Sequence, residues 1–190
     1  PGNDYRGGNI LVNAPEEAIA QLRAAKDLSL GLAYWLQHEV QRDDGGRGYP
    51  EFRLRRDVLG AEDGLSKFPY IRESRRIRAV KTILEPELTA PYQQGVRAAH
   101  FADSVGIGLY AIDLHESKRG RKQIINPAKP FQVPLGALIP VGVKNLLPAG
   151  KNIGTTHITN GCYRLHPVEW NVGEVAGLLA AHCIEKGLVP

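Results

Sequence analysis

The first third of the chain carries one strong helical pattern. From about Ala14 to Val40, apolar residues recur every three or four positions, which is the spacing of one face of an α-helix. Asn13 is the predicted N-cap, and Pro15 suits the first turn. Turn chemistry at 42–48 (RDDGGRG) then stops the pattern. The sequence therefore predicts a long amphipathic helix over 14–42.

Strand patterns predominate in the middle of the chain. Residues 76–83 alternate polar and apolar side chains, which is the period of a half-buried strand. Gly106–Leu114 is short, apolar and β-rich, and Gln132–Ile139 is a third strand candidate. A charged turn is predicted between these two, at 116–122. Because strands outnumber helices here, we expect a central, mostly antiparallel sheet.

The C-terminal region combines a predicted strand, a loop and a helix. Asn145–Gly150 has the pattern of a short buried strand, and 151–161 that of a loop of small and polar residues. Pro167 opens a helix that runs to Lys186, with Gly187 as its stop. The fold class is therefore α/β (α+β), with a strand-loop-helix that docks on the sheet.

Composition excludes several classes of partner. The net charge is +4 over 190 residues, and Lys and Arg are scattered among Asp and Glu, so no nucleic-acid partner is expected. No apolar run approaches the roughly 18 residues of a membrane helix, so no membrane partner is expected either. Cys162 and Cys183 form no CxxC motif, which favours packed thiols over metal ligands and is compatible with a cytoplasmic location.

The glycines at 106–111 (GIGLYA) match the dinucleotide pattern GxGxxG/A in spacing only. That pattern needs a strand before it, a helix after it and an acidic residue about 20 residues on. Here the following residues stay β-like, and 130–134 offers no carboxylate. We expect these glycines to permit close strand packing instead. Since the chain also begins at Pro1 and contains no methionine, we expect a fragment of a longer polypeptide.

The start of the last predicted helix has the chemistry of a ligand site. A helix N-terminus leaves backbone N–H groups unpaired and carries partial positive charge, so it favours an electron-rich oxygen. Small residues would let this helix lie close against a sheet or a ligand: Gly173, Ala176, Gly177 and Ala180. Many α/β proteins contain such a turn, so a purely structural role is equally open.

The C-terminal motifs resemble a known family. Asn145–His157 (NLLPAGKNIGTTH), Gly161–Pro167 (GCYRLHP) and Gly173–Gly177 (GEVAG) are together similar to the C-terminal flavin segment of FAD-dependent oxidoreductases in the glutathione-reductase-like superfamily. Three further stretches extend the likeness over nearly the whole chain: Phe68–Ile77, Asp113–His115 and Val133–Pro140.

The resemblance implies an architecture and a cofactor, FAD. Residues 1–140 would form the substrate-binding portion, and 141–190 would complete the FAD-binding domain. Gly150 and Asn152 would lie near the ribityl chain of the flavin. Backbone amides at the start of the last helix would face the pyrimidine edge of the ring; these belong to His166, Val168 and Glu169.

The family's N-terminal βαβ unit, which grips the ADP half of FAD, has no counterpart in this sequence. The resemblance therefore implies two partners, a small-molecule substrate and a missing N-terminal part of the same polypeptide. It leaves open whether the chain forms an oligomer and whether it binds FAD on its own.

Two residues are catalytic candidates. His157 lies in the small-residue loop, and histidine suits proton transfer beside a flavin. A hydrogen bond from this side chain to a loop carbonyl is equally open. Arg164 would anchor an anionic or polyol substrate, or charge on the reduced flavin. Its alternative role is a salt bridge that supports the entry to the helix.

Three residues are candidates for substrate binding: Arg72, Arg76 and His115. Arg72 and Arg76 would reach a ligand from the predicted substrate sheet, although charged strand faces are usually only solvated. Asp113 and His115 alternate onto one face of a strand, which permits a polar pair of either structural or catalytic use.

These residues and motifs predict the C-terminal fragment of an FAD-dependent oxidoreductase. Hydride would pass between a substrate carbon and the flavin. The alternative is a non-catalytic module that binds a ligand or a partner and holds no flavin.

Overall fold

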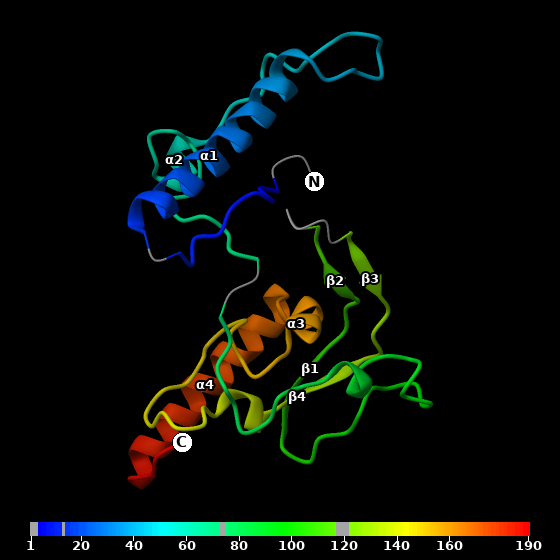
Figure 1. The fold of residues 1–190 in the computed structure, drawn as a ribbon, viewed down its shortest axis with the longest axis vertical. Helices are drawn as coiled ribbons and strands as arrows, with labels where there is room; N and C mark the ends of the chain where they lie inside the picture. Colours follow the sequence, from blue (N-terminus) through cyan, green and yellow to red (C-terminus); the bar gives the residue numbers. More distant parts are fainter. Residues whose placement is uncertain (1–3, 13, 73–74, 117–121) are drawn as a thin grey trace. The chain divides into compact units, whose positions relative to one another are not determined.

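The computed structural model describes all residues except 1–3, 13, 73–74 and 117–121. The chain divides into two compact units (Figure 1). Unit 1 contains the residues up to Tyr70, and unit 2 contains Ile71–Glu116 and Lys122–Pro190. These units reflect packing alone, so the assignment of 1–140 to substrate binding and of 141–190 to flavin binding stays a prediction.

Unit 1 is built on one long helix, α1 (Pro15–His38), with a proline in its first turn. The helix predicted over 14–42 is confirmed except at its C-terminal end. There the chain turns back, because the amide of Arg42 donates to the carbonyl of Gly46 at 2.9 Å. The predicted N-cap, Asn13, lies outside the described residues.

The segment that follows α1 returns along it. Gln37 Nε2 donates to the Phe52 carbonyl at 2.9 Å, and Lys26 forms an ion pair with Asp63. The returning segment contains one short helix, α2 (Arg56–Leu59). No residue of α1 or α2 is fully buried, so the apolar face of α1 is only partly covered.

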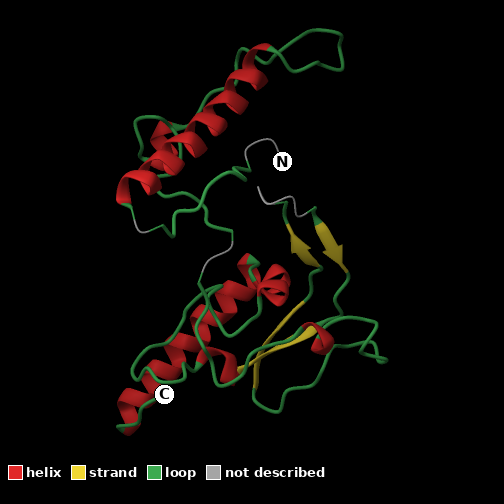
Figure 2. Ribbon diagram, viewed as in Figure 1, coloured by secondary structure: helices red, strands yellow, loops and turns green. Residues whose placement is uncertain are grey.

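Unit 2 contains two small antiparallel sheets (Figure 2). β1 (Ser104–Gly108) pairs with β4 (Phe131–Pro134), and β2 (Ile112–Leu114) pairs with β3 (Ile124–Asn126). The predicted mixture of helices and antiparallel strands is confirmed. The single central sheet is wrong, since two two-stranded sheets are formed in its place.

The strand predicted over 76–83 is wrong. This segment makes only two isolated bridges, which join Ala79 to Pro140 and Ile83 to Thr155. Its partners are loop residues. The alternation of polar and apolar positions therefore reflects half-burial without a continuous ladder.

The strands predicted over 106–114 and 132–139 are right in part. The first prediction covers two separate strands, β1 and β2, with an interruption at 109–111. The second strand ends at Pro134, where the chain continues as the 3-10 helix η2 (Leu135–Leu138).

The strand predicted over Asn145–Gly150 is wrong. Asn145 has a φ of 55°, in the left-handed region, which an extended strand does not use. The segment is a loop, and half of its residues are exposed. The charged turn predicted over 116–122 lies outside the described residues at 117–121.

Three further helices belong to unit 2: η1 (Glu85–Glu87), α3 (His157–Tyr163) and α4 (His166–Lys186). The predicted C-terminal helix is confirmed as α4, and Gly187 ends it with a φ of 64°. The loop predicted over 151–161 is wrong in its second half, which is α3. Among the described residues, no helix is both long and apolar enough to cross a membrane.

The core of unit 2 lies where α3 packs on β2 and α4 packs on β1. The largest side chains that are fully buried there are Tyr163, Phe131, Ile83, Leu88, Ile112 and Leu138. Both cysteines, Cys162 and Cys183, are buried and free, as predicted for packed thiols.

Gly106 and Gly108 allow α4 to approach β1. A Cβ added at Gly106 would lie 1.4 Å from Asn171 Oδ1, and one at Gly108 would lie 2.9 Å from Val168 Cγ2. A second strand, not a helix, follows β1. The glycines therefore serve close packing, as predicted, but at Gly106 the neighbour is the helix α4 and not a strand.

Candidate functional site

The cap of α3 holds the loop that precedes it. Thr156 Oγ1 accepts from the Thr159 amide at 3.1 Å, and Thr159 Oγ1 accepts from the Thr156 amide at 2.9 Å. Thr159 Oγ1 also donates to the Ile83 carbonyl at 2.8 Å, in the buried interior. This reciprocal cap ties the start of α3 to a distant segment of the chain.

The same loop passes very close to its neighbours at Gly154. A Cβ added there would lie 2.4 Å from the Lys81 carbonyl oxygen and 2.5 Å from Ala79 Cβ. The Ile83 amide donates to the Gly154 carbonyl at 2.9 Å, and the Gly154 amide donates to the Ala137 carbonyl at 2.8 Å. The position therefore needs glycine, and the loop has a defined path.

The first turn of α4 presents backbone amides. Leu165 is the N-cap and supplies no side-chain cap. Pro167 has no N–H, and the Glu169 amide donates to the Leu165 carbonyl at 2.8 Å. The amides of His166 and Val168 precede that first helical hydrogen bond. They can serve an electron-rich oxygen, whereas the Glu169 amide is already committed to the helix.

Gly150 lies beside this first turn. A Cβ added at Gly150 would lie 3.4 Å from Glu169 Oε2. The other carboxylate oxygen, Glu169 Oε1, is buried and has no hydrogen-bond partner among the described residues. A buried acceptor without a donor is costly. The position therefore suits a hydroxyl or a ring N–H of a ligand.

Arg164 joins three segments of unit 2. It follows α3 directly, and only 6% of the residue is exposed. Its Nη2 donates to the Asp113 carbonyl at 2.5 Å, and its Nη1 donates to the Arg72 carbonyl at 3.3 Å. Two backbone carbonyls therefore orient the guanidinium group.

Lys151 belongs to the same electrostatic environment. Burial lowers the pKa of the Lys151 ammonium group, the Glu169 carboxylate raises it, and Arg164 and Arg72 lower it again. Two guanidinium groups and one carboxylate therefore act on the Lys151 ammonium group.

β2 adds an imidazole and a carboxylate. His115 Nε2 lies 3.3 Å from Asp113 Oδ2, and the two side chains are 16% and 19% exposed. Gln123 Nε2 donates to the other carboxylate oxygen, Asp113 Oδ1, at 3.2 Å. Ile112 and Leu114 are buried, so strand alternation places Asp113 and His115 on the opposite face. The polar pair predicted from that alternation is confirmed.

These contacts and charges connect six residues, which we call the polar cluster: Arg72, Asp113, His115, Lys151, Arg164 and Glu169. Four of them are predicted site residues. Sequence reasoning missed Lys151, and the available signal was its position directly after Gly150 in the predicted ligand loop.

The remaining predicted site residues lie on the elements around this cluster. His157 is the first residue of α3 and is half-buried, as is Arg76. Asn152 is exposed, and its carbonyl accepts from the Ile77 amide at 3.0 Å. His166 is exposed at the start of α4. The functional roles of these residues stay predictions.

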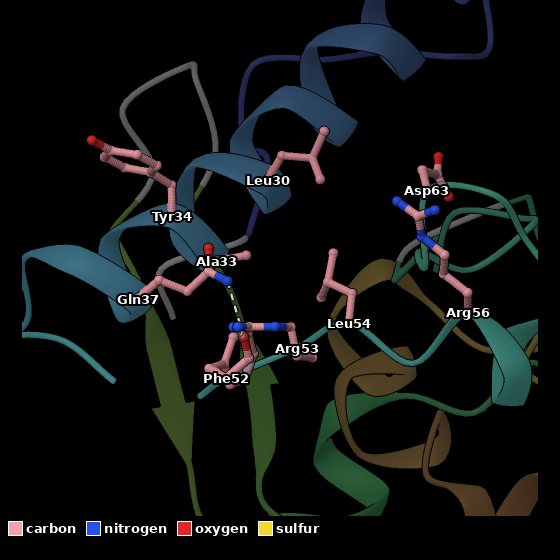
Figure 3. A pocket seen from close by; sticks show the side chains of 9 residues that line it. All are labelled: Leu30, Ala33, Tyr34, Gln37, Phe52, Arg53, Leu54, Arg56 and Asp63. Atoms are coloured by element: carbon pink, nitrogen blue, oxygen red, sulfur yellow. Dashed lines mark hydrogen bonds between the residues drawn. The ribbon is translucent and has the colours of Figure 1, made fainter. Parts of the chain in front are cut away.

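A separate open hollow lies on unit 1, with a cavity volume of about 420 Å³ (Figure 3). α1 contributes apolar side chains such as Leu30, and the returning segment contributes Leu54 and Arg56. None of the predicted site residues lines it. The hollow is therefore distinct from the residues that the motifs indicate.

The loop, the start of α4 and the polar cluster together bring backbone amides and charged side chains of unit 2 to the motifs that the sequence singled out. The chain belongs to the FAD dependent oxidoreductase family, whose model matches residues 2–190. The family predicted from the motifs is therefore confirmed. No curated protein and no solved structure matches the chain.

Proposed function

We propose that this chain is the C-terminal part of an FAD-dependent oxidoreductase of the glutathione-reductase-like superfamily. Residues 141–190 complete the flavin site, and the segments around β2 face a small-molecule substrate. The observation that carries this proposal is the first turn of α4, which presents two backbone amides and Glu169. The Oε2 atom of Glu169 lies beside Gly150, and its Oε1 atom is buried without a partner among the described residues.

The residues at this turn suit the groups that a flavin presents. The amides of His166 and Val168 would receive a carbonyl oxygen of the ring, with the partial positive charge of the helix start behind them. Glu169 Oε1 would accept a hydrogen bond from the ring or from the ribityl chain. Gly150 leaves room for that chain, and Asn152 would lie near it.

When bound, FAD supplies two-electron redox chemistry. The protein's own residues bind and orient the reactants. Arg164 and Arg72, with Arg76, would hold an anionic or polyol substrate, and His157 is the acid/base candidate from the sequence. The remaining part of the flavin site would come from further residues of the same polypeptide.

The test is flavin binding by the whole polypeptide that contains this chain. The purified protein should show the visible absorbance of bound FAD. Gly150→Leu should weaken FAD binding at least about tenfold, because the new side chain occupies the space beside α4. The matched control is Gly95→Leu, since no side-chain atom lies within 4 Å of a Cβ at that exposed position.

Each result separates the two candidate functions. If the protein holds no flavin even after reconstitution with FAD, the oxidoreductase proposal fails and the non-catalytic module is favoured. If Gly150→Leu and Gly95→Leu bind FAD equally well, a flavin site exists but does not lie at the start of α4.

A further inference from the structure

The hollow on unit 1 has the size and the lining of a small-molecule site. Its volume of about 420 Å³ lies within the roughly 300–1,000 Å³ of typical ligand pockets. We propose that it binds a small organic anion with an apolar body, such as an aryl or alkyl carboxylate or sulfonate. This inference does not depend on the proposed function, because none of the predicted flavin or substrate residues lines the hollow.

One face of α1 forms the floor of the hollow. Leu30, Ala33 and Gln37 line it and follow each other at intervals of three and four residues, so they lie on one side of the helix. Lys26, four residues before Leu30, continues the same side. Tyr34 adds an aromatic ring to the lining. The floor is therefore apolar at its centre and polar at both ends.

Two side-chain contacts hold the returning segment against α1, one at each end of the floor. At one end Gln37 Nε2 donates to the Phe52 carbonyl at 2.9 Å (Figure 3). At the other end Lys26 forms an ion pair with Asp63. Phe52 and Asp63 both line the hollow. The hollow is therefore a gap in the packing between two points at which the chain is tied to the helix.

The wall opposite α1 has a defined path. Gly64 has a φ of 70°, and a Cβ added there would lie 2.7 Å from Leu54 Cβ. The Leu65 amide donates to Asp63 Oδ1 at 3.0 Å. These contacts fix the position of Leu54, which faces Leu30 across the hollow in Figure 3. The two leucines thus supply apolar surface from opposite sides.

The apolar side chains of the hollow remain in contact with water. Leu30 is 40% exposed, Tyr34 59% and Phe52 37%. An apolar body in the hollow would remove part of this surface from water, and the gain is proportional to the apolar area that is covered. The lining therefore favours an aromatic or alkyl ligand over a purely polar one.

The charges around the hollow favour an anion. The carboxylate of Asp63 is already paired with Lys26, which lowers the pKa of the Asp63 carboxyl. Two further cations line the hollow, Arg53 and Arg56. Arg53 donates to the Phe52 carbonyl at 2.7 Å, and this neutral acceptor does not cancel its charge. Among the described residues, the guanidinium group of Arg56 makes no hydrogen bond or ion pair. Arginine is well suited to bind a carboxylate.

The first experiment measures where an amphipathic anion binds to the whole polypeptide that contains this chain. The probe is anilinonaphthalene sulfonate, an aromatic anion whose fluorescence rises when its rings leave water. Ala33→Phe fills the hollow and should weaken binding of the probe at least about tenfold. The matched control is Ala181→Phe on α4, because Ala181 is exposed and does not line the hollow.

The second experiment tests the preference for an anion. Arg56→Gln should weaken binding of the sulfonate at least about threefold, which is the scale of an exposed ion pair. Phenylnaphthylamine has a similar apolar body without the charge, so its affinity should stay the same in this variant. Arg55→Gln is the matched control, since Arg55 is paired with Asp57 and does not line the hollow.

Three outcomes overturn the proposal. If Ala33→Phe binds the sulfonate as tightly as Ala181→Phe does, the probe does not enter the hollow. If Arg56→Gln binds the sulfonate as tightly as Arg55→Gln does, the hollow does not select an anion. If the natural polypeptide binds neither probe, the hollow is covered by another part of the protein.

A further variant covers an Ala33→Phe protein that does not fold. Leu30→Gln removes apolar surface from the floor without filling the hollow, and it should also weaken binding of both probes. Its matched control is Leu178→Gln, at a leucine of α4 that is 66% exposed. Equal affinities of these two variants for both probes would overturn the proposal.

Discussion

The two compact units differ in how they keep apolar side chains from water. In unit 2 the strands and helices enclose a core in which Ile83, Leu88 and Val133 are 0% exposed. In the described part of unit 1 no apolar side chain is fully buried, and on α1 Tyr34 is 59% and Trp35 46% exposed. An amphipathic pattern therefore predicts a helix, but it does not tell how completely the apolar face is covered. Stability should depend on unit 2 far more than on unit 1.

The largest expected effect is the loss of a core aromatic ring from unit 2. Phe131 is 2% exposed, and its ring centroid lies 4.4 Å from that of Tyr163. Phe131→Ala should lower the free energy of unfolding by about 3–5 kcal/mol. Trp35→Ala is the matched change in unit 1 and should cost about 1 kcal/mol, because roughly half of that side chain stays exposed. Urea unfolding measures both, and equal losses would contradict the comparison.

A smaller effect is expected from one methyl group. Gly154→Ala should cost about 1–3 kcal/mol, because the new Cβ meets the Lys81 carbonyl at 2.4 Å. Gly31→Ala on α1 meets nothing within 4 Å and should stabilise the protein by about 0.5–1 kcal/mol, since alanine favours the helix. Thermal unfolding of the two variants should therefore shift in opposite directions. If both variants lowered the midpoint, α1 would be tightly packed at Gly31, and if both raised it, the Gly154 loop would not be tightly packed.

Alkaline pH should weaken unit 2 through a buried thiol. Burial raises the pKa of Cys162 from 9.0 to about 12. The folded protein then keeps a proton that the unfolded chain releases, so the stabilisation is complete below about pH 9 and is lost as the pH rises toward 12. The loss should be on the order of 1 kcal/mol per pH unit in this window. Cys162→Ala should flatten the pH dependence of urea unfolding, and an unchanged slope would contradict the burial of this thiol.

The smallest effect is expected at the ion pair of unit 1. Lys26 lowers the pKa of the Asp63 carboxyl, but the two side chains are 50% and 32% exposed. Solvent screens such pairs strongly. Lys26→Ala should therefore leave the unfolding midpoint within experimental error, while the pKa of Asp63 rises toward its ordinary value in an NMR titration. A clear loss of stability would show that unit 1 depends on this contact.

The helices were the most predictable part of the fold because their signals are local. The apolar period and Pro15 predicted α1. The glycine at 187 predicted the end of α4, where the structure shows a positive φ. α3 escaped prediction because its cap, formed by Thr156 and Thr159, was hidden in a run of small residues.

Two of the strand predictions failed, because strand pairing is decided by residues elsewhere in the chain. The alternation at 76–83 was real, but the partners that the fold supplies to this segment are loops near Pro140 and Thr155. The apolar run at 145–150 contains Asn145 in a left-handed conformation, which the apolar pattern does not reveal.

The sequence predicted which residue types form the candidate site, but it did not predict the hydrogen bonds that join them. The motifs indicated Arg164 and His115, and the alternation of β2 indicated the pair with Asp113. The link between them is a hydrogen bond from Arg164 to a backbone carbonyl 51 residues away, and backbone acceptors leave no mark in a side-chain pattern. The same is true of the Arg72 carbonyl, 92 residues away.

The bond from Thr159 Oγ1 to the Ile83 carbonyl has a consequence for how the protein folds. The bond is buried and joins residues 76 positions apart. The core around Ile83 therefore cannot form completely before α3 is present. Contacts of such sequence separation slow folding, because the entropy of closing a long loop is lost before the contact is gained. On the ribosome, unit 2 should therefore remain open until α3 has been synthesised, and a chaperone would have its longest access to the chain during that interval.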